Sequence, residues 1–309
     1  MLPTEHDVHV NQIMSNISVL YKNTEFIADK VAPIIDVKKK SDIVPLYSKA
    51  DWFRDEIVPR GVSSEGPRGG YRIDVSNSYT CIDYSWAKEV ADQVKNNADP
   101  PFNLEVEATE YAKNVLLLGM EGRVASMIFT AANWTSTSTP SNLWNDYAAS
   151  DPFYDILYTA VSTVRGLIGR DPNTMVIGAQ VWDILRTHPD FLSKLSNNDK
   201  RILTVDATAA LLGFDKLLVG KAIKATSVEG ASTTTMAYIW GKHCWIGYVA
   251  PKPGLRTPTA AYIFSHGPSD YVKSWREENK SQDVYEAWHS VDEYVVSADC
   301  GYMFANIVA

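Results

Sequence analysis

Apolar residues recur at helical spacing through one long segment in the first half of the chain. Between 102 and 132, apolar or small residues return every three or four positions: Leu104, Ala108, Tyr111, Val115, Leu118, Gly122, Ala125 and Phe129. This periodicity predicts an amphipathic helix with a length on the order of 40 Å. Pro101 can open it, and Glu105, Glu107 and Glu110 would complement the positive end of its dipole.

Alternating and continuous apolar runs elsewhere predict strands. Residues 71–86 alternate with a change of phase near 80–82, which indicates a bulge or kink. Further strands are expected at 174–178, 217–220, 236–240, 244–250, 260–264, 284–288 and 294–296. Further helices are expected at 10–21, 151–169, 179–187 and 206–213, the second beginning at Asp151 and ending at Gly169. The mixture lacks a regular βαβ rhythm and therefore indicates the α+β class.

The segment 41–70 differs from the rest of the chain. Apolar residues are sparse there, while Pro, Gly and charged residues are frequent. Long loops inside compact domains are uncommon, so the segment is predicted to be a protruding arm whose partner lies elsewhere. Trp52 and Phe53 favour an arm over disorder, because disordered segments are usually poor in aromatic residues.

Composition excludes several classes of protein. The 309 residues carry a net charge of −8, which argues against nonspecific nucleic-acid binding. Cys81, Cys244 and Cys300 lie far apart, which argues against a zinc knuckle or a disulfide framework. The polar start at 1–10 and the absence of an apolar run of about 20 residues predict a soluble chain without a signal peptide or membrane span.

Motifs for catalysis and cofactor binding are missing from the sequence. The segment 213–222 has the wrong glycine spacing for a phosphate loop, and no nucleophile elbow occurs. His266 lies in a Gly-Pro turn, and the pair His6 and His9 is weak support for a metal. We therefore expect no catalytic residue, no cofactor and no metal, which favours a structural or binding role over an enzyme.

Several stretches, taken in order, resemble one known family. They are ADPPFNLE at 98–105, LLLGME at 116–121, NTMVIG at 173–178, VW at 181–182, LRTHP at 185–189, IWG at 239–241 and CGYM at 300–303. Together with the arm and the long helix, they resemble the major capsid proteins of tailed bacteriophages of the Hong Kong 97 type. The resemblance covers nearly the whole chain, and the order of the stretches is more specific than any one of them.

The resemblance implies an α+β capsid fold with five parts. These are an N-terminal arm (1–37), an extended β-hairpin loop (38–75), a peripheral domain (76–145) with a spine helix at about 102–132, an axial domain (146–275), and return strands to the peripheral domain (276–309). It also implies a structural protein that self-assembles, as pentamers and hexamers, into the icosahedral shell around a double-stranded DNA genome. The shell is expected in the virion, after assembly in the bacterial cytoplasm.

The same resemblance suggests partners and contacts. Scaffolding, portal and decoration proteins are expected, as is packaged DNA without sequence-specific binding, and no membrane. The candidate inter-subunit contacts are Lys49, Trp52, Phe53, Arg54, Asp55, Arg60, Arg68, Glu105 and Glu110. Two alternatives remain open: the shell of an encapsulin-type compartment, and a soluble hydrolase whose active site has no known motif.

Overall fold

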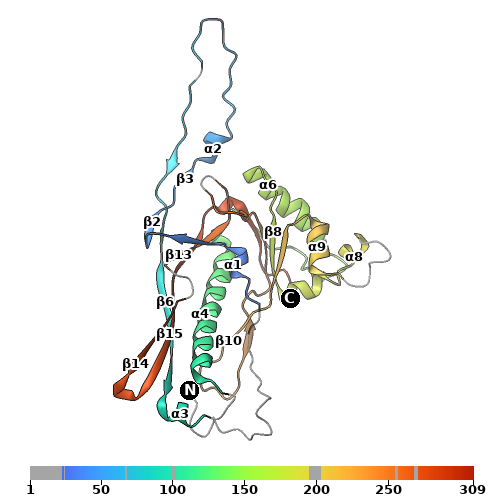
Figure 1. Ribbon diagram of the computed structural model, residues 1–309. Helices are drawn as coiled ribbons and strands as arrows, with labels where there is room; N and C mark the ends of the chain where they lie inside the picture. Colours follow the sequence, from blue (N-terminus) through green and yellow to red (C-terminus); the bar gives the residue numbers. More distant parts are fainter. Residues whose placement is uncertain are drawn as a thin grey trace.

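Two β-sheets connected by one long helix form the body, and a hairpin arm projects from one end of it (Figure 1). The computed structural model describes residues 23, 25–66, 68–98, 102–194, 203–254, 257–267 and 271–309. The predicted helix at 10–21 and the predicted helix opener Pro101 lie outside these residues. Among the described residues, no helix is long and apolar enough to cross a membrane.

The first sheet is organised around one long strand, β15 (Gln282–Val295). Its start lies between β14 (Tyr271–Glu277) and β6 (Ile82–Ala91), and its end pairs with β13 (Ala261–His266). Strand β1 (Ile34–Val37) adds to β13 in parallel. Because β15 is a single strand, the prediction of two separate strands at 284–288 and 294–296 is wrong.

The long helix α4 (Leu104–Ile128) packs across β6 and β15. Asn103 caps it, because its side chain accepts a hydrogen bond from the backbone N–H of Val106. At 1.5 Å per residue the helix is roughly 37 Å long. Its buried residues are Ala108, Ala112, Met120, Glu121, Val124, Ala125 and Ile128. The predicted apolar face is thus only partly correct: Tyr111 is 50% exposed, whereas the charged Glu121 is fully buried.

The second sheet has the strand order β7-β16-β12-β8-β9 and carries helices beside it (Figure 1). The strands are β7 (Ser136–Ser138), β16 (Gly301–Phe304), β12 (Cys244–Gly247), β8 (Thr174–Gly178) and β9 (Lys216–Gly220). The helices are α5 (Pro152–Tyr154), the π-helical segment η2 (Asp155–Val161), α6 (Ser162–Ile168), α7 (Ala179–Leu185), α8 (Pro189–Lys194) and α9 (Val205–Leu212). The predicted ends of the 151–169 helix are confirmed: Asp151 caps it, and Gly169 closes it with φ 68°.

The two sheets divide the chain differently from the expected parts. Strand β13 and most of β14 fall within the predicted 146–275 part, but both strands pair in the first sheet. Strand β16 falls within the predicted return segment, but it pairs with β12 and β7 in the second sheet. The chain therefore crosses between the sheets again near its end, which local periodicity cannot reveal because pairing joins residues distant in sequence.

Short elements complete the fold. They are α1 (Ala28–Val31), β2 (Ser41–Ile43), β3 (Leu46–Tyr47), α2 (Lys49–Trp52), β4 (Ile73–Asp74), β5 (Ser78–Thr80), α3 (Asp92–Asn96), η1 (Ala131–Asn133), β10 (Ile223–Ala225), β11 (Met236–Tyr238), η3 (Glu278–Lys280) and η4 (Ala298–Cys300). The predicted phase change at 80–82 is the point where pairing switches: β5 pairs with β2, and β6 pairs with β15.

Two glycines in the core lie directly against a tryptophan side chain or against neighbouring backbone. Trp144, Trp240 and Trp245 are fully buried. A Cβ atom on Gly220 would lie 2.1 Å from Cγ of Trp240, and one on Gly178 would lie 1.8 Å from the carbonyl oxygen of Gly241. Protein interiors are close-packed, so neither position has room for a side chain.

We expect Gly178→Ala to lower the free energy of unfolding by about 1–3 kcal/mol, because the new methyl group must displace backbone. Gly166→Ala is the control, because a Cβ there meets nothing within 4 Å and lies inside α6. This control is expected to stabilise the subunit by up to about 1 kcal/mol. Urea unfolding of the unassembled subunit measures both changes, and equal effects would contradict the packing argument.

Candidate inter-subunit interface

The arm is a hairpin whose strands pair only near the body (Figure 1). Beyond the β3–β4 ladder no strand is formed in its described residues, so the predicted β-hairpin extends less far than expected. Every described residue from 52 to 76 is exposed, and Ile57 and Val62 are 91% and 98% exposed. Backbone and apolar groups that are exposed to solvent in this way are typical of a segment that binds another chain.

The base of the arm is held in one orientation. Asp51 accepts a hydrogen bond from the backbone N–H of Arg72 (3.0 Å), which is the main cause of its lowered pKa. The backbone N–H of Ser48 donates to the carbonyl of Arg72 at 3.0 Å. The rings of Tyr47, Trp52 and Tyr71 form a cluster, with centroids 5.8–6.4 Å apart. The two sides of the hairpin are therefore fastened where they leave the body.

Two of the predicted contact residues bind the body of their own subunit. Lys49 Nζ lies 2.6 Å from Asp299 Oδ2, and Asp299 Oδ1 accepts from the Thr135 hydroxyl at 2.7 Å. The Phe53 ring packs on Gly169, where a Cβ atom would lie 3.4 Å from the ring. These contacts connect the arm base to the start of β16 and to the end of α6.

The remaining candidates fall into two groups at opposite ends of the molecule (Figure 1). On the arm, Arg54 pairs with Glu56 (3.1 Å), Asp55 accepts from the backbone N–H of Ile57, Arg60 donates to the carbonyl of Ser64, and Arg68 pairs with Glu65 (3.4 Å). On α4, Glu105 pairs with Lys95, and Glu110 is exposed. Such exposed ion pairs contribute little stability within a subunit.

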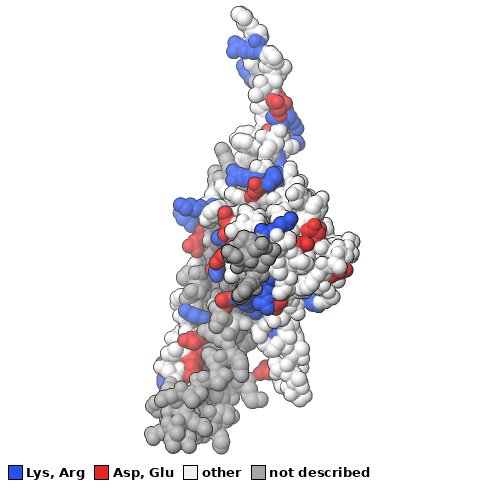
Figure 2. Space-filling model, turned by 90° about the vertical axis from the view of Figure 1, so that its right-hand side faces the viewer, with Lys and Arg blue, Asp and Glu red and all other residues white. Residues whose placement is uncertain are grey.

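Positive and negative side chains are interspersed on the face seen in Figure 2. The arm itself carries both signs along its length. A surface of this kind suits contacts between complementary charges at close range, whereas nonspecific nucleic-acid binding needs a continuous basic patch.

One arrangement resembles a catalytic triad but has the wrong hydrogen bonds. The Ser150 hydroxyl lies 3.2 Å from His188 Nε2, and His188 Nδ1 lies 3.4 Å from Asp190 Oδ2. However, Nδ1 accepts the backbone N–H of Asp190, which places the ring proton on Nε2. The Ser150 hydroxyl donates to the carbonyl of Asp146 at 2.6 Å. The histidine therefore caps the start of α8 and is not positioned as a base.

Glu121 is a buried residue whose role the sequence did not reveal. Its Oε1 accepts from the backbone N–H of Ile27 (3.0 Å) and from Trp240 Nε1 (2.6 Å), and Oε2 accepts from the N–H of Ala28 (2.9 Å). Burial raises the pKa of Glu121, an effect that these hydrogen bonds oppose. The only sequence signal is its position directly after the apolar run 115–120.

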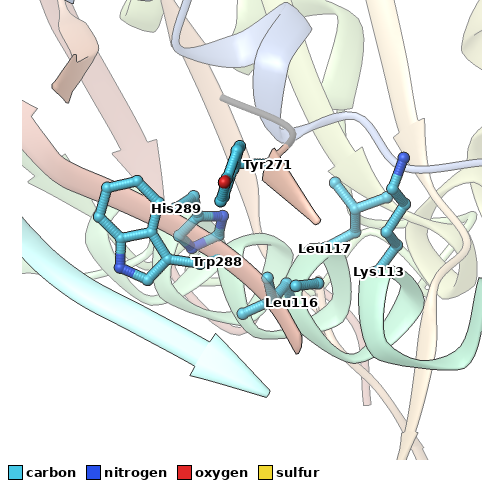
Figure 3. Close-up of a pocket in the computed structure, with 7 residues that line it drawn as sticks. Lys113, Leu116, Leu117, Tyr271, Trp288 and His289 are labelled. Atoms are coloured by element: carbon cyan, nitrogen blue, oxygen red, sulfur yellow. The ribbon is translucent and has the colours of Figure 1, made fainter. Parts of the chain in front are cut away.

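The described part of the chain offers little room for a small molecule and no cluster of metal ligands. A small hollow of about 80 Å³ lies between α4 and the β14–β15 hairpin (Figure 3). Small-molecule sites usually occupy roughly 300–1,000 Å³. Across the described residues, no group of three or more His, Cys, Asp or Glu side chains is placed to hold a metal ion.

Known proteins match this chain along nearly its entire length. It is 26% identical over 313 residues to a major capsid protein of Burkholderia phage BcepMu, and 24% identical over 305 residues to one of Pseudomonas phage JBD67. Each match covers 96% of both chains. No protein-family model matches.

Solved structures share the fold. A phage-related protein from Bordetella bronchiseptica superimposes with a TM-score of 0.72 at 19% identity, covering 96% of this chain and 97% of that one. The capsid structure of cyanophage P-SCSP1u gives 0.60 at 10% identity, with 98% of each chain covered. The prediction of an α+β capsid fold of the Hong Kong 97 type is confirmed.

We expect His188→Asn to reduce the sensitivity of the subunit to acid. Burial lowers the pKa of His188, while the carboxylates of Asp190 and Asp151 oppose the shift. The stabilising contribution of the neutral ring is therefore present above about pH 6.5 and is lost as the pH falls through the lowered pKa. Asn retains an acceptor for the N–H of Asp190 but does not titrate.

Urea unfolding between pH 5 and pH 7.5 tests this expectation. The free energy of unfolding of the unchanged protein should fall more steeply with acid than that of the variant. His266→Asn, at a half-exposed histidine, serves as the control and should follow the unchanged protein. If the pH dependence of His188→Asn also runs parallel to that of the unchanged protein, buried His188 is not the acid-sensitive group.

Proposed function

We propose that this chain, as the major capsid protein of a tailed phage, closes in many copies into the icosahedral shell around the double-stranded DNA genome. The observation that carries the proposal is the match in sequence and fold over nearly the whole chain to phage capsid proteins. The exposed arm fits this role, because a subunit designed to act alone would not leave its apolar residues in water.

The arm crosses a neighbouring subunit in this proposal. Residues 53–72 form two sides of about ten residues each, which at 3.3 Å per residue reach about 33 Å. Each subunit gives one arm and receives one, so the contact is heterologous and closes into pentameric and hexameric rings. Many weak contacts repeated around a closed shell add up to high stability.

The charged candidates have complementary roles across that contact. Arg60 and Arg68 on the arm would face acidic side chains of a neighbour, and Glu105 and Glu110 at the start of α4 are the proposed acceptors. Trp52, Arg54 and Asp55 would lie where the arm leaves its own subunit and meets the next. Lys49 and Phe53 would act indirectly, because their contacts with Asp299 and Gly169 set the direction of the arm.

The finer assignments follow from the same role. We assign the first sheet with α4 to a peripheral domain and the second sheet with its helices to an axial domain. Scaffolding, portal and decoration proteins are the proposed partners, and DNA is enclosed without sequence-specific contacts. The subunit acts in the virion after assembly in the bacterial cytoplasm, and its role is structural and not catalytic.

The two alternatives have less support. An encapsulin-type compartment has the same fold, but the full-length sequence matches are to phage major capsid proteins. A hydrolase needs an activated nucleophile, and the hydroxyl and imidazole of Ser150 and His188 have the wrong donor and acceptor roles for that step.

We expect the purified chain, with or without a scaffolding protein, to form rings or shells visible by negative-stain microscopy. Replacing residues 55–70 with a short Gly-Ser linker should leave a folded subunit that forms no shells. The reason is that the described residues of this segment are exposed in the subunit and, in this proposal, bind a neighbour.

Circular dichroism and thermal unfolding verify that the arm-deleted subunit remains folded. A substitution at an exposed apolar residue away from the arm, Val228→Ser between β10 and β11, provides the control and should assemble normally. Normal shells from the arm-deleted chain, or a stable monomer from the unchanged chain under all conditions, would contradict the proposal.

A further inference from the structure

The middle of α4 presents apolar side chains that its own subunit covers incompletely. Leu116, Leu117 and Leu118 follow one another, so they point in three directions around the helix. All three are only half-buried. The three leucines make this part of the helix apolar on more than one side, and the subunit fully covers none of them. This arrangement favours cover by another chain.

A hollow lies directly beside these leucines. It is lined by Lys113, Leu116 and Leu117 from α4, by Tyr271 from β14, and by Ala287, Trp288 and His289 from β15 (Figure 3). A space of about 80 Å³ compares with roughly 10–15 Å³ for one water-sized group. The hollow therefore holds about five to eight such groups, which is room for one branched aliphatic side chain and too little for most metabolites.

Its rim carries one exposed cation. Lys113 lies at the α4 side of the hollow and is exposed, whereas Leu116 and Leu117 form the apolar floor nearby (Figure 3). A matching ligand therefore has an aliphatic side chain next to a carboxylate.

Among the described residues beyond the β3–β4 ladder, one segment of the arm has this combination. Ile57 is 91% exposed and directly follows Asp55 and Glu56. Val62 is even more exposed, but Gly61 and Ser63 flank it and provide no partner for Lys113. Within one subunit the arm projects away from α4 and β14 (Figure 1), so the complementary groups meet only between two copies.

We propose that the hollow between α4 and the β14–β15 hairpin receives Ile57 from the arm of a second copy of this chain, while Lys113 pairs with Glu56 of the same arm. This inference rests on the proposed shell function and names the place where the arm docks. The half-buried leucines, the size of the hollow and the charge at its rim all point to the same occupant.

Disulfide trapping tests the contact. The three native cysteines are buried, so Ile57→Cys combined with Leu116→Cys introduces the only exposed thiols in the described part of the chain. Shells are first assembled under reducing conditions and then treated with copper phenanthroline, which accepts the electrons from two thiols as the S–S bond forms. Such a bond requires Cα atoms about 4.4–6.8 Å apart.

Non-reducing electrophoresis is expected to show a ladder of covalent chains up to whole rings, because each subunit contributes one arm and one hollow. The matched control combines Val228→Cys, which is 80% exposed on the β10–β11 turn, with Leu116→Cys and should give no ladder. Intact shells without a ladder would overturn the docking site and leave the shell function standing. Absence of shells from the unchanged chain would instead overturn the shell function itself.

A charge exchange tests the ion pair without cysteines. Lys113→Glu is expected to slow assembly about tenfold, and Glu56→Lys in the same chain is expected to restore most of the rate. If the double variant assembles no faster than Lys113→Glu alone, the pairing of Lys113 with Glu56 is wrong.

Discussion

The buried carboxylate of Glu121 connects three parts of the chain that are distant in sequence. From the middle of α4 it accepts hydrogen bonds from the backbone of Ile27 and Ala28 and from the indole of Trp240. A buried charge is costly unless it is fully hydrogen-bonded, and here three donors surround it. The same contacts satisfy N–H groups at the start of α1, which would otherwise lack partners. The interaction therefore holds the N-terminal segment, the long helix and the second sheet in one fixed arrangement.

That fixed body gives the arm its direction. Lys49 is anchored to Asp299 beside β16, and Phe53 rests on Gly169 at the end of α6, so both contacts are made with the body of the subunit. Beyond them the hairpin has no contact that would cover Ile57 or Val62. The subunit thus combines a stable base with an arm whose apolar groups remain in water until a second copy arrives. Preorganisation of this kind lowers the entropic cost of association, because the binding segment already points outward.

Local sequence signals predicted the elements well, and the contacts between distant elements poorly. The periodicity of α4, the buried strand β8 and the helix end at Gly169 follow from side-chain pattern and turn chemistry, which act over a few residues. The arm followed from its composition. The placement of β13 and β16 in their sheets was not predicted. Several strands pair with partners more than a hundred residues away in the sequence, which local patterns do not reveal. Burial of Glu121 was missed for the same reason: its donors come from positions 27, 28 and 240.

Weak individual contacts are an advantage for a closed shell. An exposed ion pair contributes at most about 1 kcal/mol, and one aliphatic side chain in a hollow adds about 1.5–3 kcal/mol. Contacts of this strength break readily when only one or two neighbours are present, so a misplaced subunit can leave. A subunit surrounded by neighbours holds several of them at once, and leaving requires all of them to open together. The mixed charges of the arm and its proposed apolar anchor, Ile57, therefore suit a shell that must form without errors and then remain closed.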